Sequence, residues 1–259
     1  MPEGDTVYRT AKHLHEALAG RPLTVSDFRV PKFASVDLVG EIVEGVVARG
    51  KHLLTRVGDH SIHTHLKMEG TWHIYRHGTR WRRPAYQARI VLENADWVTV
   101  GFELGVVELV ERDREDEVVG HLGPDLLGPD WDPDEAVRRL AADGSREIDV
   151  ALLDQRNLAG LGNVYANELC FLRGMLPQRP VGEVRDLPGV VTLAHRLITT
   201  NRDRVERTTT GDLRPGRQTW VYGRDGRPCL RCGTRIRRGS MGASELTQRV
   251  TYWCPVCQS

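Results

Sequence analysis

The chain has 259 residues, of which 40% are hydrophobic and 27% are charged, a composition typical of a soluble globular protein with one large or two modest domains. No run approaches the ~18 apolar residues of a membrane span, and the N-terminus lacks an apolar signal segment. We therefore expect a cytoplasmic protein with no membrane partner.

The net charge of +1 conceals an uneven distribution of charged side chains. Residues 93–143 carry 15 acidic residues against 4 arginines, whereas residues 202–259 carry 12 arginines against 5 acidic residues. Arginine is the cation whose planar fork best matches a phosphate group. The asymmetry is typical of a protein that docks an anionic partner at its C-terminal end, and a solvated arginine-rich face is the alternative.

The chain begins Met-Pro-Glu. Removal of Met1 would leave Pro2 with a free secondary amine of pKa about 8, partly neutral near physiological pH and able to attack a carbonyl carbon. Glu3 would lie beside this amine as a proton donor. On these residues alone, an ordinary terminus that Pro2 merely stiffens is the alternative interpretation.

An amphipathic helix is predicted over residues 6–19, with Asp5 as its N-cap and Gly20 at its end. Residues 23–110 then contain several short strands with turn signals, including a hairpin at residues 89–102, and this pattern favours a β-sandwich.

Within this strand region, apolar residues alternate with polar ones over residues 62–69. His63 and His65 fall on one face of that strand. Because the sequence places no further ligand beside them, we expect a half-solvated strand face rather than a metal site.

A Pro/Gly/Asp-rich linker over residues 121–133 leads into a helical region. Glycines at positions 160 and 162 precede Asn163, which would open a helix whose exposed amides can bind phosphate. Glycine-rich helix starts are common, so this feature is only moderately specific. The helices predicted in this half cover residues 134–142, 147–158, 163–172 and 190–201.

Four of the five cysteines form two Cys-x-x-Cys pairs, Cys229/Cys232 and Cys254/Cys257, with 21 residues between them. Such pairs can close a tetrahedral thiolate site, and strand patterns at residues 234–236 and 250–253 suggest a zinc hairpin. Redox pairs or disulfides are the alternative, which a cytoplasmic protein disfavours. Cys170 lies in an apolar helical stretch and is predicted to be a core residue.

Six motifs occur together in a fixed order, and together they resemble the formamidopyrimidine-DNA glycosylase/endonuclease VIII family over essentially the whole chain. The motifs are MPEGD at the start, GKHLL at 50–54, HLKMEG at 65–70, HLGPDLL at 121–127, LAGLGNVYANE at 158–168 and YWCPVCQ at 252–258.

This resemblance implies catalytic roles for four residues and a DNA contact for a fifth. Pro2 matches the nucleophile that forms a Schiff base with the sugar, and Glu3 matches the general acid/base. Lys51 matches a lysine that assists elimination and contacts phosphate. Asn163 and Arg249 match phosphate-holding residues of the helix–two-turn–helix element and of the zinc finger, and Arg249 is also implicated in the second elimination.

Two further DNA contacts follow from the resemblance. Met68 corresponds to the apolar wedge that fills the gap left by a flipped base, and Lys67 would touch the opposite strand. Three departures from the family pattern stand out: Thr6 replaces a frequent glutamate, residues 237–248 would be an insert that alters the placement of the finger arginine, and residues 99–109 lack the void-filling loop.

The resemblance thus implies an α+β fold. An N-terminal β-sandwich with an N-terminal helix would occupy residues 1–120, a linker 121–133, a helix–two-turn–helix domain 134–223 and a zinc finger 224–259. The enzyme would be a monomer with one structural Zn²⁺ that removes oxidised bases, preferably pyrimidines, from duplex, bubble or single-stranded DNA and nicks the strand by β/δ-elimination. A catalytically silent zinc-finger protein that only recognises damage is the alternative.

Overall fold

The structure, a computed structural model, describes residues 2–242 and 248–259 and divides into two units, Met1–His121 and Leu122–Ser259. Each unit has its own apolar core. The finer division into a linker, a helical domain and a finger stays a prediction. In the part of the chain that the structure describes, no helix combines the length and apolarity needed to cross a bilayer.

The first helix, α1 (Gly4–Leu18), begins two residues before the predicted range. The prediction that Asp5 caps it is wrong, because Asp5 is the second residue of the helix and its carboxylate accepts the N–H of Thr6 at 2.7 Å. Glu3 occupies the N-cap position instead. The predicted apolar stripe is confirmed, and its members are fully buried: Val7, Ala11, Leu14 and Leu18.

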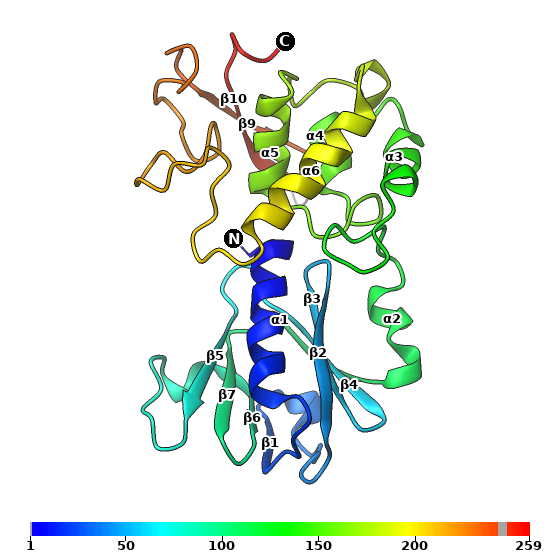
Figure 1. The fold of residues 1–259 in the computed structure, drawn as a ribbon, viewed down its shortest axis with the longest axis vertical. Coiled ribbons are helices and arrows are strands. Elements are labelled where there is room, and N and C mark those ends of the chain that lie inside the picture. The colour runs from blue at the N-terminus through cyan, green and yellow to red at the C-terminus, as the bar shows by residue number, and fades with distance from the viewer. Residues whose placement is uncertain (1, 243–247) are drawn as a thin grey trace. The chain divides into compact units, whose positions relative to one another are not determined.

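Two four-stranded antiparallel sheets follow α1 (Figure 1), in the orders β1-β6-β7-β5 and β2-β3-β4-β8. Apolar residues of both sheets and of α1 meet in a single core, which confirms the predicted β-sandwich with an N-terminal helix. The strands are β1 (Val25–Phe28), β2 (Val43–Arg49), β3 (His52–Val57), β4 (His60–His65), β5 (Thr71–Arg76), β6 (Ala88–Glu93), β7 (Trp97–Phe102) and β8 (Val106–Glu111). A short helix, α2 (Asp116–Val119), completes the unit.

The second unit is helical, as predicted, with α5 (Asn163–Leu172) over the predicted range. The prediction that a helix runs from 147 to 158 is wrong at its end, because α4 (Ile148–Leu153) stops where Asp154 becomes extended. The carboxylate of Asp154 accepts hydrogen bonds from Arg146 and Arg156, which holds this turn outside the helix. The other two helices are α3 (Pro133–Ala141) and α6 (Leu187–Asn201).

Part of the stretch predicted as a linker packs into the second unit. Leu126 is fully buried and its N–H donates to the carbonyl of Ala159, whose own N–H donates to Pro124. These bonds place residues 124–126 beside the turn that precedes α5.

The C-terminal hairpin is built from β9 (Arg237–Met241) and β10 (Arg249–Trp253) (Figure 1). The expectation that residues 234–236 form its first strand is wrong, because β9 begins only at Arg237. Those residues instead bond back to residues 226–229, for example from the Ile236 N–H to the Arg227 carbonyl at 3.0 Å. The stretch 237–248, predicted as an insert, therefore contains β9 itself, and its residues 243–247 lie outside the described residues.

Candidate active site and metal centre

The start of α1 holds the predicted nucleophile and its acid. Glu3 is fully buried as the N-cap, and its backbone carbonyl accepts the Val7 N–H at 3.0 Å. Pro2 is half-buried directly before it. Because Val7 belongs to the sandwich core, the helix gives these two residues a rigid support that a free terminus would lack. Residue 1 lies outside the described residues, so the removal of Met1 stays a prediction.

Lys51 lies at the tip of the β2–β3 hairpin. Arg49 and His52 pair across a two-residue turn made of Gly50 and Lys51. Gly50 has φ 57°, a left-handed conformation that glycine adopts without strain and that two-residue hairpins require. Lys51 is half-buried at this turn. Burial is the main cause of the lowered pKa of His65, and the charges of Lys67 and Lys51 add to it.

Behind Lys51 lies a histidine cluster that the sequence analysis missed: His52, His63, His65 and His121. The expectation of a half-solvated strand face is wrong for His63, which is only 4% exposed because β4 is an inner strand of its sheet. All four histidines are visible in the sequence. They come together only when β3, β4 and the end of the first unit fold against one another.

Two hydrogen bonds order part of this cluster. His63 Nδ1 lies 3.0 Å from the carboxylate of Glu108 on β8, and His63 Nε2 lies 2.8 Å from His52 Nδ1. A neutral His63 that donates to Glu108 from Nδ1 must accept at Nε2, so His52 donates from its Nδ1. Burial, reinforced by nearby histidines and lysines, lowers the pKa of His52 to about 3 and that of His65 to about 4. Both imidazoles are therefore neutral near physiological pH.

Met68 lies at the tip of a tight turn between β4 and β5. Its side chain is 61% exposed, which agrees with an apolar side chain offered to a ligand rather than packed in the core. The turn closes through the Gly70 N–H and the Leu66 carbonyl at 2.9 Å, and a Cβ on Gly70 would lie 2.5 Å from that carbonyl oxygen. Lys67 adopts φ 52°, and its stem lies so close to Gly105 that a Cβ there would overlap it.

The connection between β7 and β8 is also short. It contains only residues 103–105, so the structure has no long loop where the sequence departs from the family pattern. Glu103 takes a left-handed φ of 48° and pairs with Arg83 at 2.6 Å.

In the second unit, the start of α5 and the finger strand β10 are bonded together. Asn163 donates from its side-chain amide to the carbonyl of Val250 at 2.8 Å, and Asn167 accepts the N–H of Tyr252. Thr251 donates to the buried carboxylate of Asp149 on α4 at 3.0 Å. Arg249 precedes Val250 and is exposed, so these bonds hold it next to Asn163.

A buried carboxylate that the sequence analysis missed fixes the chain ahead of the finger. Glu168 on α5 is fully buried and accepts three consecutive backbone N–H groups, those of residues 220–222, at 2.7–2.9 Å. The hydroxyl of Thr209 donates to the same carboxylate. Burial raises the pKa of Glu168, and these four donors oppose that effect.

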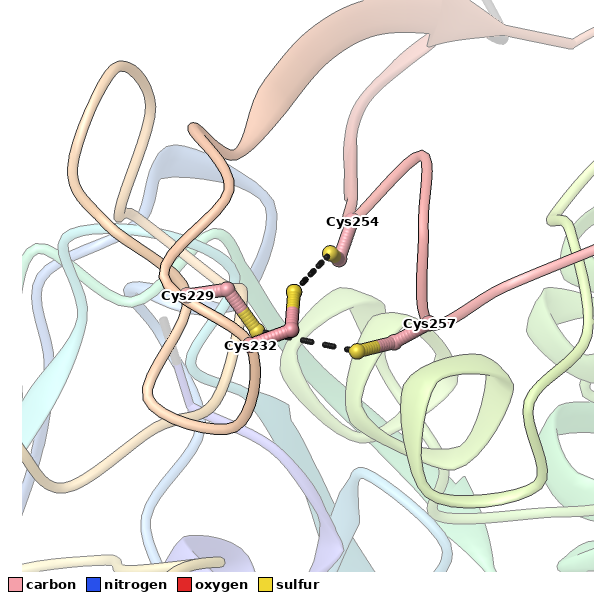
Figure 2. Close-up of side chains that lie close together, drawn as sticks. All are labelled: Cys229, Cys232, Cys254 and Cys257. Carbon is pink, nitrogen blue, oxygen red and sulfur yellow. Dashed lines mark hydrogen bonds between the residues drawn. The ribbon is translucent and has the colours of Figure 1, made fainter.

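The four predicted cysteine ligands form a metal-binding site (Figure 2). Their sulfur atoms all lie within 4.8 Å of one another, with 3.5 Å between Cys232 and Cys254 and 3.9 Å between Cys229 and Cys257. Tetrahedral coordination at about 2.3 Å per metal–sulfur bond places sulfur atoms about 3.8 Å apart. The four sulfur atoms therefore fit the tetrahedral metal site that the Cys-x-x-Cys spacing predicted. Cys170 lies apart in the helical core and is fully buried, as predicted.

Two family patterns together cover most of the chain. The formamidopyrimidine-DNA glycosylase N-terminal domain matches residues 1–123, and the formamidopyrimidine-DNA glycosylase H2TH domain matches residues 122–211. The chain belongs to the formamidopyrimidine-DNA glycosylase family. It is a DNA glycosylase and AP lyase of base-excision repair, of the endonuclease 8 type.

Named relatives align with the whole chain. It is 54% identical to a probable endonuclease 8 2 of Streptomyces coelicolor, with 100% of this chain and 94% of the relative covered. It is 53% identical to the DNA-(apurinic or apyrimidinic site) lyase Nei2 of Mycolicibacterium smegmatis, with 100% and 99% covered.

Solved structures agree in fold at low sequence identity. A complex between the LlFpg protein, a THF-DNA and an inhibitor superposes with a TM-score of 0.82 at 22% identity over 100% of both chains. A complex between the Lactococcus lactis Fpg and an abasic site containing DNA gives 0.81 at 22% identity over 99% of both. These likenesses confirm the α+β architecture.

Proposed function

We propose that this enzyme removes oxidised bases through the free amine of Pro2 and then cleaves the strand. The observation that carries the proposal is the fully buried Glu3 carboxyl at the N-cap of α1, directly after Pro2. A helix anchored in the sandwich core supports Pro2 and Glu3 as consecutive residues, which suits a nucleophile with an adjacent acid/base.

The proposed reaction uses Pro2 first as a nucleophile. The Pro2 nitrogen attacks C1′ of the sugar, the N-glycosidic bond breaks, and the base leaves with the bonding electron pair and takes up a proton. The sugar opens to an iminium, with Glu3 as the group that moves the proton at the sugar. The iminium acidifies C2′, so loss of a 2′ proton expels the 3′ phosphate (β-elimination), and loss of the 4′ proton then expels the 5′ phosphate (δ-elimination).

Other residues hold the DNA in this proposal. Lys51, at a hairpin tip, assists elimination and contacts phosphate, and Met68, exposed on its turn, fills the gap left by the flipped base. Lys67 touches the opposite strand. Arg249, beside Asn163 through the bond to Val250, binds phosphate with it and takes part in the second elimination.

The metal is zinc in this proposal, one ion per chain. Two Cys-x-x-Cys turns are the usual ligand set of structural zinc, and the small apolar cluster around the finger contains only a few residues. The ion would stabilise the hairpin that carries Arg249. We further propose that the enzyme acts as a monomer.

The preferred lesions are proposed to be oxidised pyrimidines. The stretch between α6 and the finger is bonded to Glu168 of α5 at two places, through the Thr209 hydroxyl and through the N–H groups of residues 220–222. A stretch tied so closely to the protein leaves no long lid to close over a flipped purine, so hydrogen bonds to a purine edge would go unmade. Single-stranded and bubble substrates would be accepted too, since unstacking costs least where pairing is weak.

The decisive experiment is borohydride trapping on abasic-site DNA followed by peptide mapping. We expect a covalent adduct at Pro2, lost in Pro2→Gly and in protein that retains Met1, as checked by intact mass. An adduct on a lysine would contradict Pro2 as nucleophile. Single-turnover excision of 5-hydroxyuracil, thymine glycol and 8-oxoguanine opposite cytosine tests the lesion preference, and faster removal of 8-oxoguanine than of both pyrimidines would contradict it.

A further inference from the structure

The first Cys-x-x-Cys turn of the finger carries Arg231, a residue to which no role has been assigned above. Arg231 lies between Cys229 and Cys232, and its backbone N–H donates to the Cys229 sulfur at 3.4 Å. The turn is also closed by the Gly233 N–H, which donates to the Cys229 carbonyl at 2.9 Å. A metal ion bound by both cysteines would therefore fix the backbone of Arg231 as well.

The side chain of Arg231 contacts two aromatic rings from other parts of the second unit. Its guanidinium carbon lies 4.5 Å from the ring centroid of Phe171, on α5, and 5.6 Å from that of Trp220. The two rings are stacked, with centroids 5.4 Å apart and planes at 21°. A guanidinium within about 6 Å of an aromatic centroid is attracted by the face of the ring. In the described part of the chain no carboxylate pairs with Arg231, so these rings are the partners of its charge.

Trp220 connects the two ends of the segment 208–222. Its backbone N–H donates to the Glu168 carboxylate at 2.7 Å, and its indole Nε1 donates to the carbonyl of Thr209 at 3.3 Å. Because the Thr209 hydroxyl also donates to Glu168, the Trp220 ring links the two places at which the segment is bonded to α5. Val221 is fully buried and packs with two of the four cysteines in one apolar cluster. The metal site and this segment are therefore in direct contact.

We propose that Arg231 is a positioning residue through which the metal site holds the segment 208–222. With a metal bound, Arg231 is fixed over Phe171 and Trp220, and the Trp220 ring keeps both ends of the segment in place. Without a metal, the turn that carries Arg231 is no longer fixed, and Glu168 alone holds the segment. The lesion preference would then depend on the metal of the finger. That consequence rests on the proposed function, which assigns the lesion preference to this segment, whereas the coupling itself does not.

Hydrogen exchange on the metal-loaded protein tests the coupling. Arg231→Ala keeps all four cysteines, so elemental analysis should show the metal content of wild type. The backbone N–H groups of residues 209–222 should exchange about fivefold faster, the effect expected when a cation is removed from two rings. Arg231→Lys keeps a cation but not the planar guanidinium, so its exchange rate should lie between those of Arg231→Ala and wild type. Chelation of the metal in wild type should also accelerate exchange in this segment.

A matched control is Arg237→Ala, which removes the same charge from an exposed position on β9. Unchanged exchange at residues 209–222 in Arg231→Ala, unchanged exchange after chelation of wild type, or an equal rise in the control would each overturn the coupling. If Arg231→Ala loses the metal, metal-loaded Arg231→Lys takes its place, and exchange equal to that of wild type would overturn the proposal.

Single-turnover excision of 5-hydroxyuracil and of 8-oxoguanine in matched duplexes tests the consequence for the lesion preference. A looser segment can rearrange around a larger base, so we expect Arg231→Ala to lower the ratio of the two rates about fivefold. Affinity for an abasic-site analogue, which has no base to distinguish, should stay unchanged. Faster exchange with an unchanged ratio would overturn the effect on lesion preference. A wild type that does not prefer the pyrimidine would instead show that the proposed lesion preference is wrong, and the exchange result would decide the coupling by itself.

Discussion

At the scale of single residues, the N-terminal unit keeps ionisable groups neutral beside a proposed catalytic lysine. His52 donates to His63, which donates to Glu108, and all three lie behind the hairpin tip that carries Lys51. Each added proton in this cluster would repel that lysine and its neighbours. Burial of these imidazoles thus leaves Lys51 and Lys67 as cations that face the cluster near neutral pH.

A pH titration of stability tests the state of His52. Its pKa is about 3 when folded, because of burial and neighbouring cations, against about 6.5 when unfolded. The unfolded state therefore takes the proton first, and the stability is present above about pH 6.5 and is lost as pH falls toward 3. We expect the free energy of unfolding of wild type, relative to His52→Asn, to fall by about 2 kcal/mol between about pH 7.5 and 5. A difference independent of pH in urea unfolding would contradict a neutral, buried His52.

At the scale of elements, helix α5 organises the second unit. Its first turn binds β10 through Asn163 and Asn167, and Glu168 on the same helix binds the chain that leads into the finger. The helix thereby connects Asn163, which is proposed to bind phosphate, to the segment that is proposed to leave no lid over a flipped purine. A carboxylate suits this place because it only accepts hydrogen bonds, and all its partners are donors.

Replacing Glu168 with glutamine tests this arrangement. The amide would offer N–H groups to backbone donors, so at least one buried donor loses its acceptor, at a cost of about 1–3 kcal/mol. We expect faster hydrogen exchange at residues 209–222 and a smaller difference between pyrimidine and purine excision, with the β-sandwich unchanged. Glu183→Gln, at an exposed position, is the matched control. Unchanged exchange in the segment would show that Glu168 does not hold it.

At the scale of the whole molecule, the two units have separate cores, and the finger hairpin has little apolar core of its own. Metal binding to the cysteine cluster should therefore supply much of the finger's folding free energy. We expect the folding free energy of the first unit to be independent of that metal.

Cys232→Ser tests this division. We expect elemental analysis to show loss of the single bound metal ion. We also expect at least a tenfold weaker affinity for abasic-site DNA, which corresponds to about 1.4 kcal/mol of binding free energy. Thermal unfolding of the first unit should not change. Cys170→Ala, which removes a thiol outside the cluster, should keep the metal. Retention of metal by Cys232→Ser, or unfolding of the N-terminal unit with it, would contradict the assignment.

Features that depend on local pattern were predictable from the sequence. Residue spacing predicted α5 over the observed range, the buried stripe of α1 and the two cysteine pairs, because helical periodicity and tight Cys-x-x-Cys turns involve only neighbours in the chain. The order of the motifs then predicted the family, which the family models confirm, and the catalytic roles of Pro2, Glu3 and Lys51 stay predictions.

Contacts between distant residues could not be predicted from the sequence and became visible only in the folded chain. Asn163 and Val250 are bonded across 87 positions, and His63 became buried because β4 lies between two other strands. The hairpin began at Arg237 rather than at 234 because residues 234–236 found partners in the turn before them. Such pairings depend on burial and on competing hydrogen-bond partners, which no local spacing records.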